Sequence, residues 1–242
     1  MPDAPYYKPD LALVHHRGFG FHADACAPGI LAHLAPVLER GGTVLELGCG
    51  SGLLTRHLVD AGHRVIATDA SPAMVELAAA TVPDADVRRL TLPADPLPGA
   101  DAVVAVGHVL NYLPDTAAIE RALIATCAAL RPGGVLAIDL CDPRYGEARD
   151  GDRPVGFATD DWALVTVFSR PAPDAFRRSM TVFTREDDGR YRRDEEVHDN
   201  VYLPTAQVPP LLARHGVDAT LGTSFGSETL PEGLMTVIGT RR

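Results

Sequence analysis

The amino-acid sequence predicts an α/β fold: a mostly parallel sheet with helices on both faces, and an antiparallel β insertion after the fifth strand. Short apolar segments alternate with helical periodicity between residues 28 and 140, and a glycine-rich turn joins the first strand to the next helix. Strand-like segments between residues 162 and 203 follow one another without intervening helices. Alternation favours a parallel sheet, whereas consecutive strands favour antiparallel pairing.

The first predicted helix begins at Pro28 and ends before the glycine pair at 41–42. Its apolar residues recur at the spacing of a helix that packs on a sheet: Ile30, Leu31, Leu34, Val37 and Leu38. The preceding residues 1–27 show no sustained periodicity and predict an irregular cap or short helices. A cap is therefore expected before the first strand.

Two strand–helix units follow. The apolar run TVLEL predicts a strand over 43–47, and helical spacing predicts a helix from the glycine-rich turn up to Gly62. The run RVIATD predicts a strand over 64–69, and Ser71 followed by Pro72 favours the start of a helix. Two such units in succession predict parallel pairing of their strands.

The remaining elements complete the sheet and form the insertion. The core is expected to continue with strands over 86–90 and 101–106, a helix over 115–130 and a strand over 134–140. Antiparallel strands are predicted over 162–169, 175–184 and 191–203. After them, PTAQVPPLLARHG predicts a short helix with two internal prolines, and VDATLG and LMTVIGT predict the final strands.

The string ELGCGSG at 46–52 carries the clearest chemical signal. Glycines at a strand-to-helix turn let backbone N–H groups approach a ligand at the helix N-terminus, and an acid at the end of the next strand can bind ribose hydroxyls. Asp69 ends that strand, 21 residues after Gly48. The spacing is close to the roughly 20 residues typical of a nucleotide-binding βαβ unit. A ribose-containing cofactor is predicted.

The position of the third glycine separates two cofactor classes. A dinucleotide-binding loop would place it at position 53, which is Leu53, whereas here it is Gly52 and Glu46 precedes the first glycine by two residues. The string resembles motif I of the class I S-adenosylmethionine-dependent methyltransferases. The resemblance continues through DASPAM at 69–74, the run at 101–115 and LRPGGVLAIDL at 130–140. It implies a Rossmann-like sheet over about residues 30–140.

The resemblance also implies roles for individual residues. S-adenosylmethionine would be the cofactor and S-adenosylhomocysteine the product. Asp69 would hold both ribose hydroxyls, and Glu46 would contact the methionine moiety directly or through water. No carboxylate stands in register for the adenine amino group, so the backbone of 90–92 or Asp95 is expected to serve instead. The remaining cofactor candidates are Gly48, Cys49, Gly50, Gly52, Ala70, Met74, Leu90, Thr91, Leu92 and Gly107.

The methyl acceptor is expected beyond the carboxyl ends of the strands. His108 is the candidate base because imidazole titrates near neutral pH, the alternative being a histidine bonded to backbone at a helix start. Tyr112 and His198 are the other catalytic candidates. His198, Asn200 and Tyr202 alternate onto one strand face, which could be a pocket wall, solvent or an interface. The predicted acceptor pocket comprises His15, His16, Phe19, Asn111, Trp162 and Tyr202, although Trp162 could equally belong to the core.

The resemblance suggests four regions. Residues 1–27 would form a cap, 28–140 the S-adenosylmethionine-binding core, 141–203 an antiparallel acceptor lid, and 204–242 the completion of the core sheet. The insertion is similar in length and pattern to the lids of small-molecule methyltransferases, including amino-sugar N,N-dimethyltransferases and glycine N-methyltransferases. An enclosing insertion favours a small-molecule acceptor, because it would exclude water.

The composition limits which classes of partner the protein is expected to bind. The net charge of −10 disfavours nucleic acid, and the absence of an apolar run near 18 residues or a signal-like N-terminus predicts a soluble, cytoplasmic protein. Scattered cysteines and the acidic runs 186–188 and 194–196, expected in a solvated hairpin, predict no metal. A monomer and a homodimer both remain open.

The sequence therefore predicts methyl transfer to oxygen or nitrogen of a small molecule by in-line displacement. One alternative is a protein that binds S-adenosylmethionine without transferring its methyl group. The other is an NAD-dependent oxidoreductase, which Leu53 and the RPGG signature disfavour.

Overall fold

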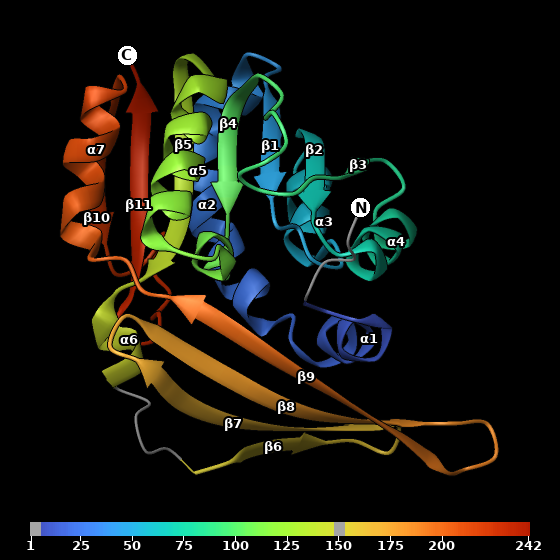
Figure 1. The fold of residues 1–242 in the computed structure, drawn as a ribbon. Coiled ribbons are helices and arrows are strands. Elements are labelled where there is room, and N and C mark those ends of the chain that lie inside the picture. The colour runs from blue at the N-terminus through green and yellow to red at the C-terminus, as the bar shows by residue number, and fades with distance from the viewer. Residues whose placement is uncertain (1–5, 148–152) are drawn as a thin grey trace.

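The computed structural model describes residues 6–147 and 153–242, so parts of the expected cap and insertion, 1–5 and 148–152, lie outside the described residues (Figure 1). Within the described chain the central sheet has seven strands in the order β10-β11-β5-β4-β1-β2-β3. Their bounds are β1 (Thr43–Leu47), β2 (Arg64–Asp69), β3 (Asp86–Arg89), β4 (Ala100–Ala105), β5 (Leu130–Cys141), β10 (Val217–Gly222) and β11 (Leu234–Arg241).

The central sheet is mostly parallel, as predicted. Strands β1 to β5 pair in parallel, and β11 inserts antiparallel between β5 and β10. Strands β1, β2 and β10 have the bounds that the sequence predicts. The mixed α/β fold with a separate antiparallel sheet is confirmed.

Helices cover both faces of the central sheet, since successive strand residues alternate between two cores (Figure 1). Val44 belongs to the core under α2 (Phe21–Glu39) and α3 (Leu53–Asp60). Leu45 belongs to the core under α5 (Thr116–Ala129) and α7 (Val208–Arg214). The other short elements are α4 (Pro72–Thr81), α6 (Pro143–Glu147), η1 (Val109–Tyr112) and η2 (Thr205–Gln207).

Two helix boundaries differ from the prediction. Helix α2 begins at Phe21 rather than Pro28, so one helix runs across the expected boundary between cap and core. Proline within a helix loses a backbone hydrogen bond, but Cys26, Ala27 and Ile30 are buried against the sheet, which favours the continuous helix. In α7 the two prolines lie in the first turn and not in the interior of the helix. Backbone N–H groups of the first turn have no acceptor within the helix, so proline loses no hydrogen bond there.

A second sheet, antiparallel throughout, follows β5 as predicted. It contains β6 (Val155–Ala158), β7 (Trp162–Ala172), β8 (Ala175–Arg185) and β9 (Tyr191–Val201) in that order. The edge strand β6 was not predicted. Figure 1 shows this sheet lying beyond the carboxyl ends of the central strands, with α1 (Pro9–Gly18) between the two sheets. The second sheet and α1 thus stand where a parallel sheet binds its ligands.

Trp162 anchors α1 to the second sheet. Its ring packs in a buried cluster with Leu11 and Val14 of α1 and with Leu164, Met180 and Val182 of the second sheet. A Cβ atom at Gly18 would lie 2.4 Å from this ring, so only glycine allows the approach. Trp162 is therefore a core residue, the alternative left open by the sequence. No helix of the described residues is long and apolar enough to cross a membrane.

Candidate functional site

The turn after β1 owes its shape to its glycines. Gly48 has φ +64° and a Cβ atom there would lie 2.5 Å from the methyl groups of Val109, so the loop and η1 could not approach as they do. Gly52 has φ +83° and begins α3, where a Cβ would crowd Ala78 and Val82 of the neighbouring helix region. Gly52 therefore serves helix packing and does not line the cavity described next.

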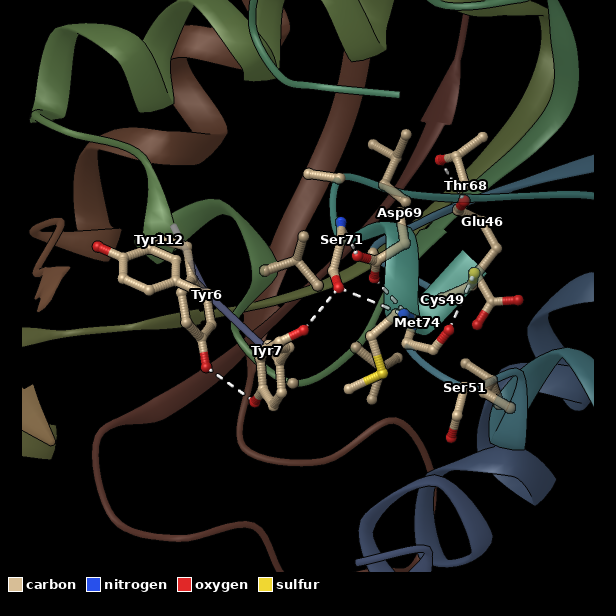
Figure 2. A pocket seen from close by; sticks show the side chains of 18 of the residues that line it. Tyr6, Tyr7, Glu46, Cys49, Ser51, Thr68, Asp69, Ser71, Met74 and Tyr112 are labelled. Carbon is tan, nitrogen blue, oxygen red and sulfur yellow. Dashed lines mark hydrogen bonds between the residues drawn. The ribbon is translucent and has the colours of Figure 1, made fainter. Parts of the chain in front are cut away.

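A cavity of about 400 Å³ opens at the carboxyl ends of β1 to β4 (Figure 2). Its volume is in the range of small-molecule and cofactor sites. Most of the predicted cofactor residues line it, together with three of the predicted acceptor and catalytic residues: Glu46, Gly48, Cys49, Gly50, Asp69, Ala70, Met74, Leu90, Thr91, Leu92, Gly107, His15, Phe19 and Tyr112. The structure thus brings segments from four strand ends and from α1 around one space.

Asp69 is held at the tip of β2 by backbone donors. Gly50 N donates to its Oδ2 at 2.9 Å and Ser71 N donates to its Oδ1 at 2.8 Å. Burial raises the pKa of this carboxyl, and these backbone hydrogen bonds oppose that shift. The side chain is therefore fixed in one orientation facing the cavity.

Glu46 is only 3% exposed, and its Oε2 accepts a hydrogen bond from Thr55 Oγ1 at 2.7 Å. Burial raises the pKa of Glu46 to about 8, with a smaller contribution from the negative charge of Asp69. The carboxyl is therefore mostly protonated at neutral pH. A cation placed in the cavity would favour its ionised form.

A histidine that the sequence analysis missed also lines the cavity. His22 Nε2 lies 3.3 Å from Oδ2 of Asp139, which is fully buried and accepts backbone N–H bonds from Gly107 and His108. Burial alone lowers the pKa of His22, but hydrogen bonds with Asp139 and Cys26 outweigh it and raise the pKa well above its usual range. The ring is thus positively charged at neutral pH. An acid inside the apolar strand GGVLAIDL was the available signal, because buried carboxylates need partners.

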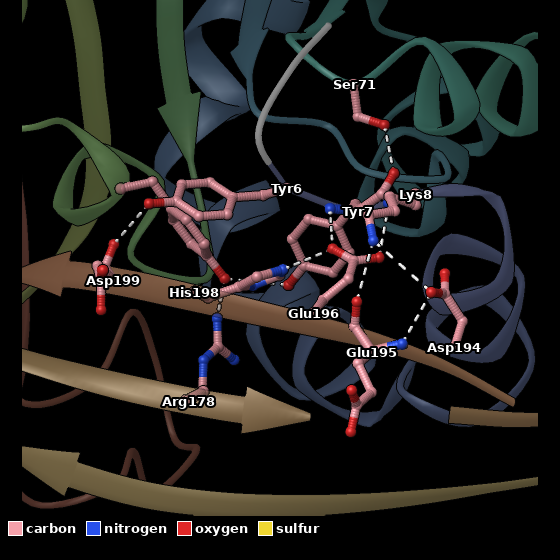
Figure 3. Close-up of polar contacts among 11 residues, drawn as sticks. Tyr6, Tyr7, Lys8, Ser71, Arg178, Asp194, Glu195, Glu196, His198 and Asp199 are labelled. Carbon is pink, nitrogen blue, oxygen red and sulfur yellow. Dashed lines mark hydrogen bonds and ion pairs between the residues drawn. The ribbon is translucent and has the colours of Figure 1, made fainter. Parts of the chain in front are cut away.

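The N-terminal segment Tyr6–Lys8, called the strap below, lies along the cavity and is tied to both sheets (Figure 3). Glu196 of β9 accepts the backbone N–H groups of Tyr7 and Lys8, each at 2.8 Å. On the other side, Ser71 Oγ donates to the carbonyl oxygen of Tyr7 at 2.7 Å. Tyr7 has φ +57°, an uncommon conformation outside glycine.

Glu196 therefore corrects one expectation. The acidic run 194–196 was predicted to be solvated, yet Glu196 is 4% exposed. Its side chain also accepts from the neighbouring His198, whose Nε2 lies 2.9 Å from Oε2. Strand alternation points Glu196 inward, and the strap's backbone donors compensate for its burial.

Two catalytic candidates lie behind the cavity wall. His108 is buried with φ +50°, and its ring stacks on that of Tyr112 with centroids 5.5 Å apart. His198 is buried beside Tyr6 and Tyr7, and burial lowers its pKa despite the opposing bond to Glu196. Neither ring lines the cavity; both contact aromatic residues that do.

The other predicted residues outside the cavity make specific structural contacts. Asn111 is buried and its amide bonds the backbone of Cys141 and Val201, which joins η1 to the ends of β5 and β9. Tyr202 is buried and stacks on Phe176, and His16 Nδ1 lies 3.0 Å from Ser51 Oγ. Asp95 accepts from Thr91 N at 2.8 Å and lies outside the cavity lining.

Within residues 6–147 and 153–242 no group of three or more histidine, cysteine, aspartate or glutamate side chains could hold a metal ion.

Residues 44–134 match a family model described as a methyltransferase domain. The ubiquinone biosynthesis O-methyltransferase of Methylobacterium sp. (strain 4-46) is 33% identical over 139 residues, 53% of this chain and 47% of that protein. The cypemycin N-terminal methyltransferase of Streptomyces sp is 31% identical over 152 residues, 59% of this chain and 60% of that protein. The chain thus spans about half the length of these curated relatives.

The fold has counterparts among solved structures. The sugar N-methyltransferase KedS8 from Streptoalloteichus sp ATCC 53650 superposes with a TM-score of 0.79 at 24% identity, covering 100% of this chain and 97% of that chain. At this identity the likeness concerns the fold. The glycine-loop sequence, the strand order and the domain match agree: residues 44–134 are a methyltransferase domain, and the fold is that of the class I S-adenosylmethionine-dependent methyltransferases.

Proposed function

We propose that this protein transfers the methyl group of S-adenosylmethionine to an oxygen or nitrogen atom of a small molecule. The observation that carries the proposal is the cavity at the ends of β1 to β4, with Asp69 at the tip of β2 and the glycine loop opposite. Tyr6 and Tyr7 of the strap line the cavity, and Glu196 of the second sheet holds the strap in place. A site covered by such a segment suits a small acceptor better than a protein or polynucleotide surface.

The lining residues fit the cofactor's charges. Asp69 retains lone pairs beyond its two backbone bonds and would accept from the ribose hydroxyls. Glu46 would ionise beside the cofactor's ammonium group, and the positively charged His22 would face its carboxylate. Among the described residues that line the cavity there is no Lys or Arg, and His22 is the cationic side chain that they supply.

When bound, the cofactor supplies an electrophilic methyl group on a sulfonium, and in-line displacement needs a positioned nucleophile. On the acceptor side, Tyr112, Tyr7 and His15 line the cavity. Burial lowers the pKa of His15 to about 4, so its ring is neutral at physiological pH and can accept a hydrogen bond from the acceptor. His108 would act through Tyr112, on which it stacks, as a positioning residue.

The proposal is tested by titrating the purified protein calorimetrically with S-adenosylhomocysteine and, separately, with NADH. We expect micromolar binding of the former alone. Acceptor panels are then screened for a mass increase of one methyl group in the presence of S-adenosylmethionine. Binding of NADH alone would contradict the proposal, and tight cofactor binding without transfer to any acceptor would favour a catalytically silent binding protein.

A further inference from the structure

Two adjacent arginines of β8 have opposite surroundings. Arg177 points to the outer face of the second sheet and pairs with Asp199, with Nε–Oδ1 and Nη2–Oδ2 distances of 2.6 and 2.8 Å. Arg178 points to the inner face, toward His198 and the strap (Figure 3), and it donates a hydrogen bond to Tyr112. Among the described residues no carboxylate lies within ion-pair distance of Arg178. A guanidinium stays charged in a protein, so within residues 6–147 and 153–242 this inward charge has no anion to balance it.

The guanidinium uses only part of its hydrogen-bonding capacity. The guanidinium donates to the hydroxyl of Tyr112 and also hydrogen-bonds the side chain of Tyr7. Its central carbon lies 5.5 Å from the centre of the Tyr112 ring. Its Nε atom is buried and has no hydrogen-bond partner among the residues that the structure describes. Glu196, a buried acid of the neighbouring strand β9, has its oxygens engaged by the strap and by His198.

Neighbouring polar groups on the same face are also unsatisfied. Asn200 is 0% exposed, and neither its Oδ1 nor its Nδ2 has a partner within the described chain. The Nδ1 atom of His198 is also buried and also has no hydrogen-bond partner among the described residues. Arg178 pairs in register with His198, and Asn200 follows two residues later, so the three side chains share one inner patch. A buried polar atom without a partner is costly, and such groups cluster where a ligand supplies the missing bonds.

The patch adjoins the cavity, because Tyr112 contacts Arg178 on one side and lines the cavity on the other. A second contact links Tyr112 to the strap, through a 3.1 Å separation of its hydroxyl from that of Tyr7. Arg178 itself does not line the cavity, so an acceptor with its nucleophile beside Tyr112 would have to extend past the Tyr112 hydroxyl to meet the guanidinium.

We propose that Arg178 binds an anionic oxygen group of the methyl acceptor, a carboxylate or a phosphate, with Asn200 and His198 bonding neutral polar groups next to it. The inference rests on the proposed methyltransferase function and names the substrate class of that same site. The Nε–H that has no partner among the described residues would donate to one oxygen of either anion. The anion would balance a positive charge for which the described residues supply no carboxylate.

The first test needs no knowledge of the acceptor. The protein saturated with S-adenosylhomocysteine is heated with about 50 mM phosphate, with acetate, or with sodium chloride at equal ionic strength. We expect phosphate or acetate to raise the unfolding midpoint by about 2–4 °C in the wild type. Arg177→Gln, which removes the outward arginine, should show the same rise, and Arg178→Gln should show none. The more stabilising anion identifies the acceptor's group.

Several results would overturn the proposal. No rise with either anion in the wild type is one, and an equal rise in Arg178→Gln is another. If Arg178→Gln does not fold, Arg178→Lys replaces it and should retain part of the rise because it keeps the charge. Failure of S-adenosylhomocysteine to bind the wild type would contradict the methyltransferase proposal, while the anion titration would still report on Arg178.

The second test uses acceptor pairs that differ only in an anionic group, such as amino sugars with and without a phosphate, or amino acids and their amides. We expect at least about tenfold higher kcat/KM for the anionic member with wild type, a preference lost in Arg178→Gln. The dissociation constant of S-adenosylhomocysteine should stay the same. Equal use of neutral and anionic members by the wild type would contradict the proposal.

Discussion

Polar side chains at the central strand ends and on the inner face of the second sheet differ in how fully they are hydrogen-bonded. Asp69 and Asp139 each accept two backbone N–H groups, and Glu46 accepts from Thr55. Arg178 and Asn200, by contrast, keep buried atoms that have no partner among the residues the structure describes. The central site is organised before any ligand arrives. In the second sheet, by our proposal, a bound ligand supplies the hydrogen-bond partners that these buried atoms lack.

The largest expected effect comes from removing a fully satisfied charge in the central sheet. Asp139→Ala would leave His22 and the N–H groups of Gly107 and His108 without their acceptor in a buried environment. We expect a loss of about 3–5 kcal/mol in the free energy of unfolding. Urea titration monitored by circular dichroism measures it. A loss under about 1 kcal/mol would mean that the central site is not organised by this carboxylate.

The next effect concerns cofactor affinity. Asp69→Asn should weaken S-adenosylhomocysteine binding by about 1.5–3 kcal/mol, or roughly 10- to 150-fold, because hydrogen bonds to a charged acceptor are lost. Calorimetric titration measures the dissociation constant. Asp86→Ala removes an exposed carboxylate of β3 that pairs with Arg88, and provides the matched control. Equal affinities for wild type and Asp69→Asn would exclude the ribose role.

A smaller effect is expected from pH. Because the pKa of Glu46 is about 8, this carboxyl binds a proton at pH 7 in the free protein and should release it when the cofactor's ammonium group arrives. Affinity for S-adenosylhomocysteine should therefore rise as pH increases from 6 toward 8, by at most about tenfold per pH unit. Titrations in buffers of different ionisation enthalpy count the released proton. Glu46→Gln should abolish the release, and a flat wild-type profile would contradict the assignment.

The smallest expected effect on stability comes from a substitution in the second sheet. Arg178→Met replaces an unbalanced inward charge by an apolar chain, so the free energy of unfolding should change by less than about 1 kcal/mol or increase. Urea titration of the ligand-free protein measures it. A loss as large as that of Asp139→Ala would show that Arg178 stabilises the fold. The polar side chains of the second sheet would then have the same structural role as those at the central strand ends.

The sequence predicts the central site better than the second one for a local reason. The glycine loop, β2 and Asp69 lie within about 25 consecutive residues, and their spacing specifies which atoms meet. The second sheet was predicted as strands, with His198, Asn200 and Tyr202 on one face whose surroundings were left open. The structure shows that all three side chains are buried. Which side chains these residues would contact was not predictable, because their partners come from remote segments.

The sequence by itself determined the α/β order, the strand bounds around the glycine loop and the family, since hydrophobic periodicity and turn glycines act over a few residues. Only the tertiary structure decided the pairing of His22 with Asp139 and of Glu196 with Tyr7, which are 117 and 189 residues apart. It also decided that Arg177 faces outward to Asp199, while Arg178 faces inward to Tyr112. Such contacts depend on how the strap, α1 and the second sheet pack against the strand ends, which no local pattern encodes.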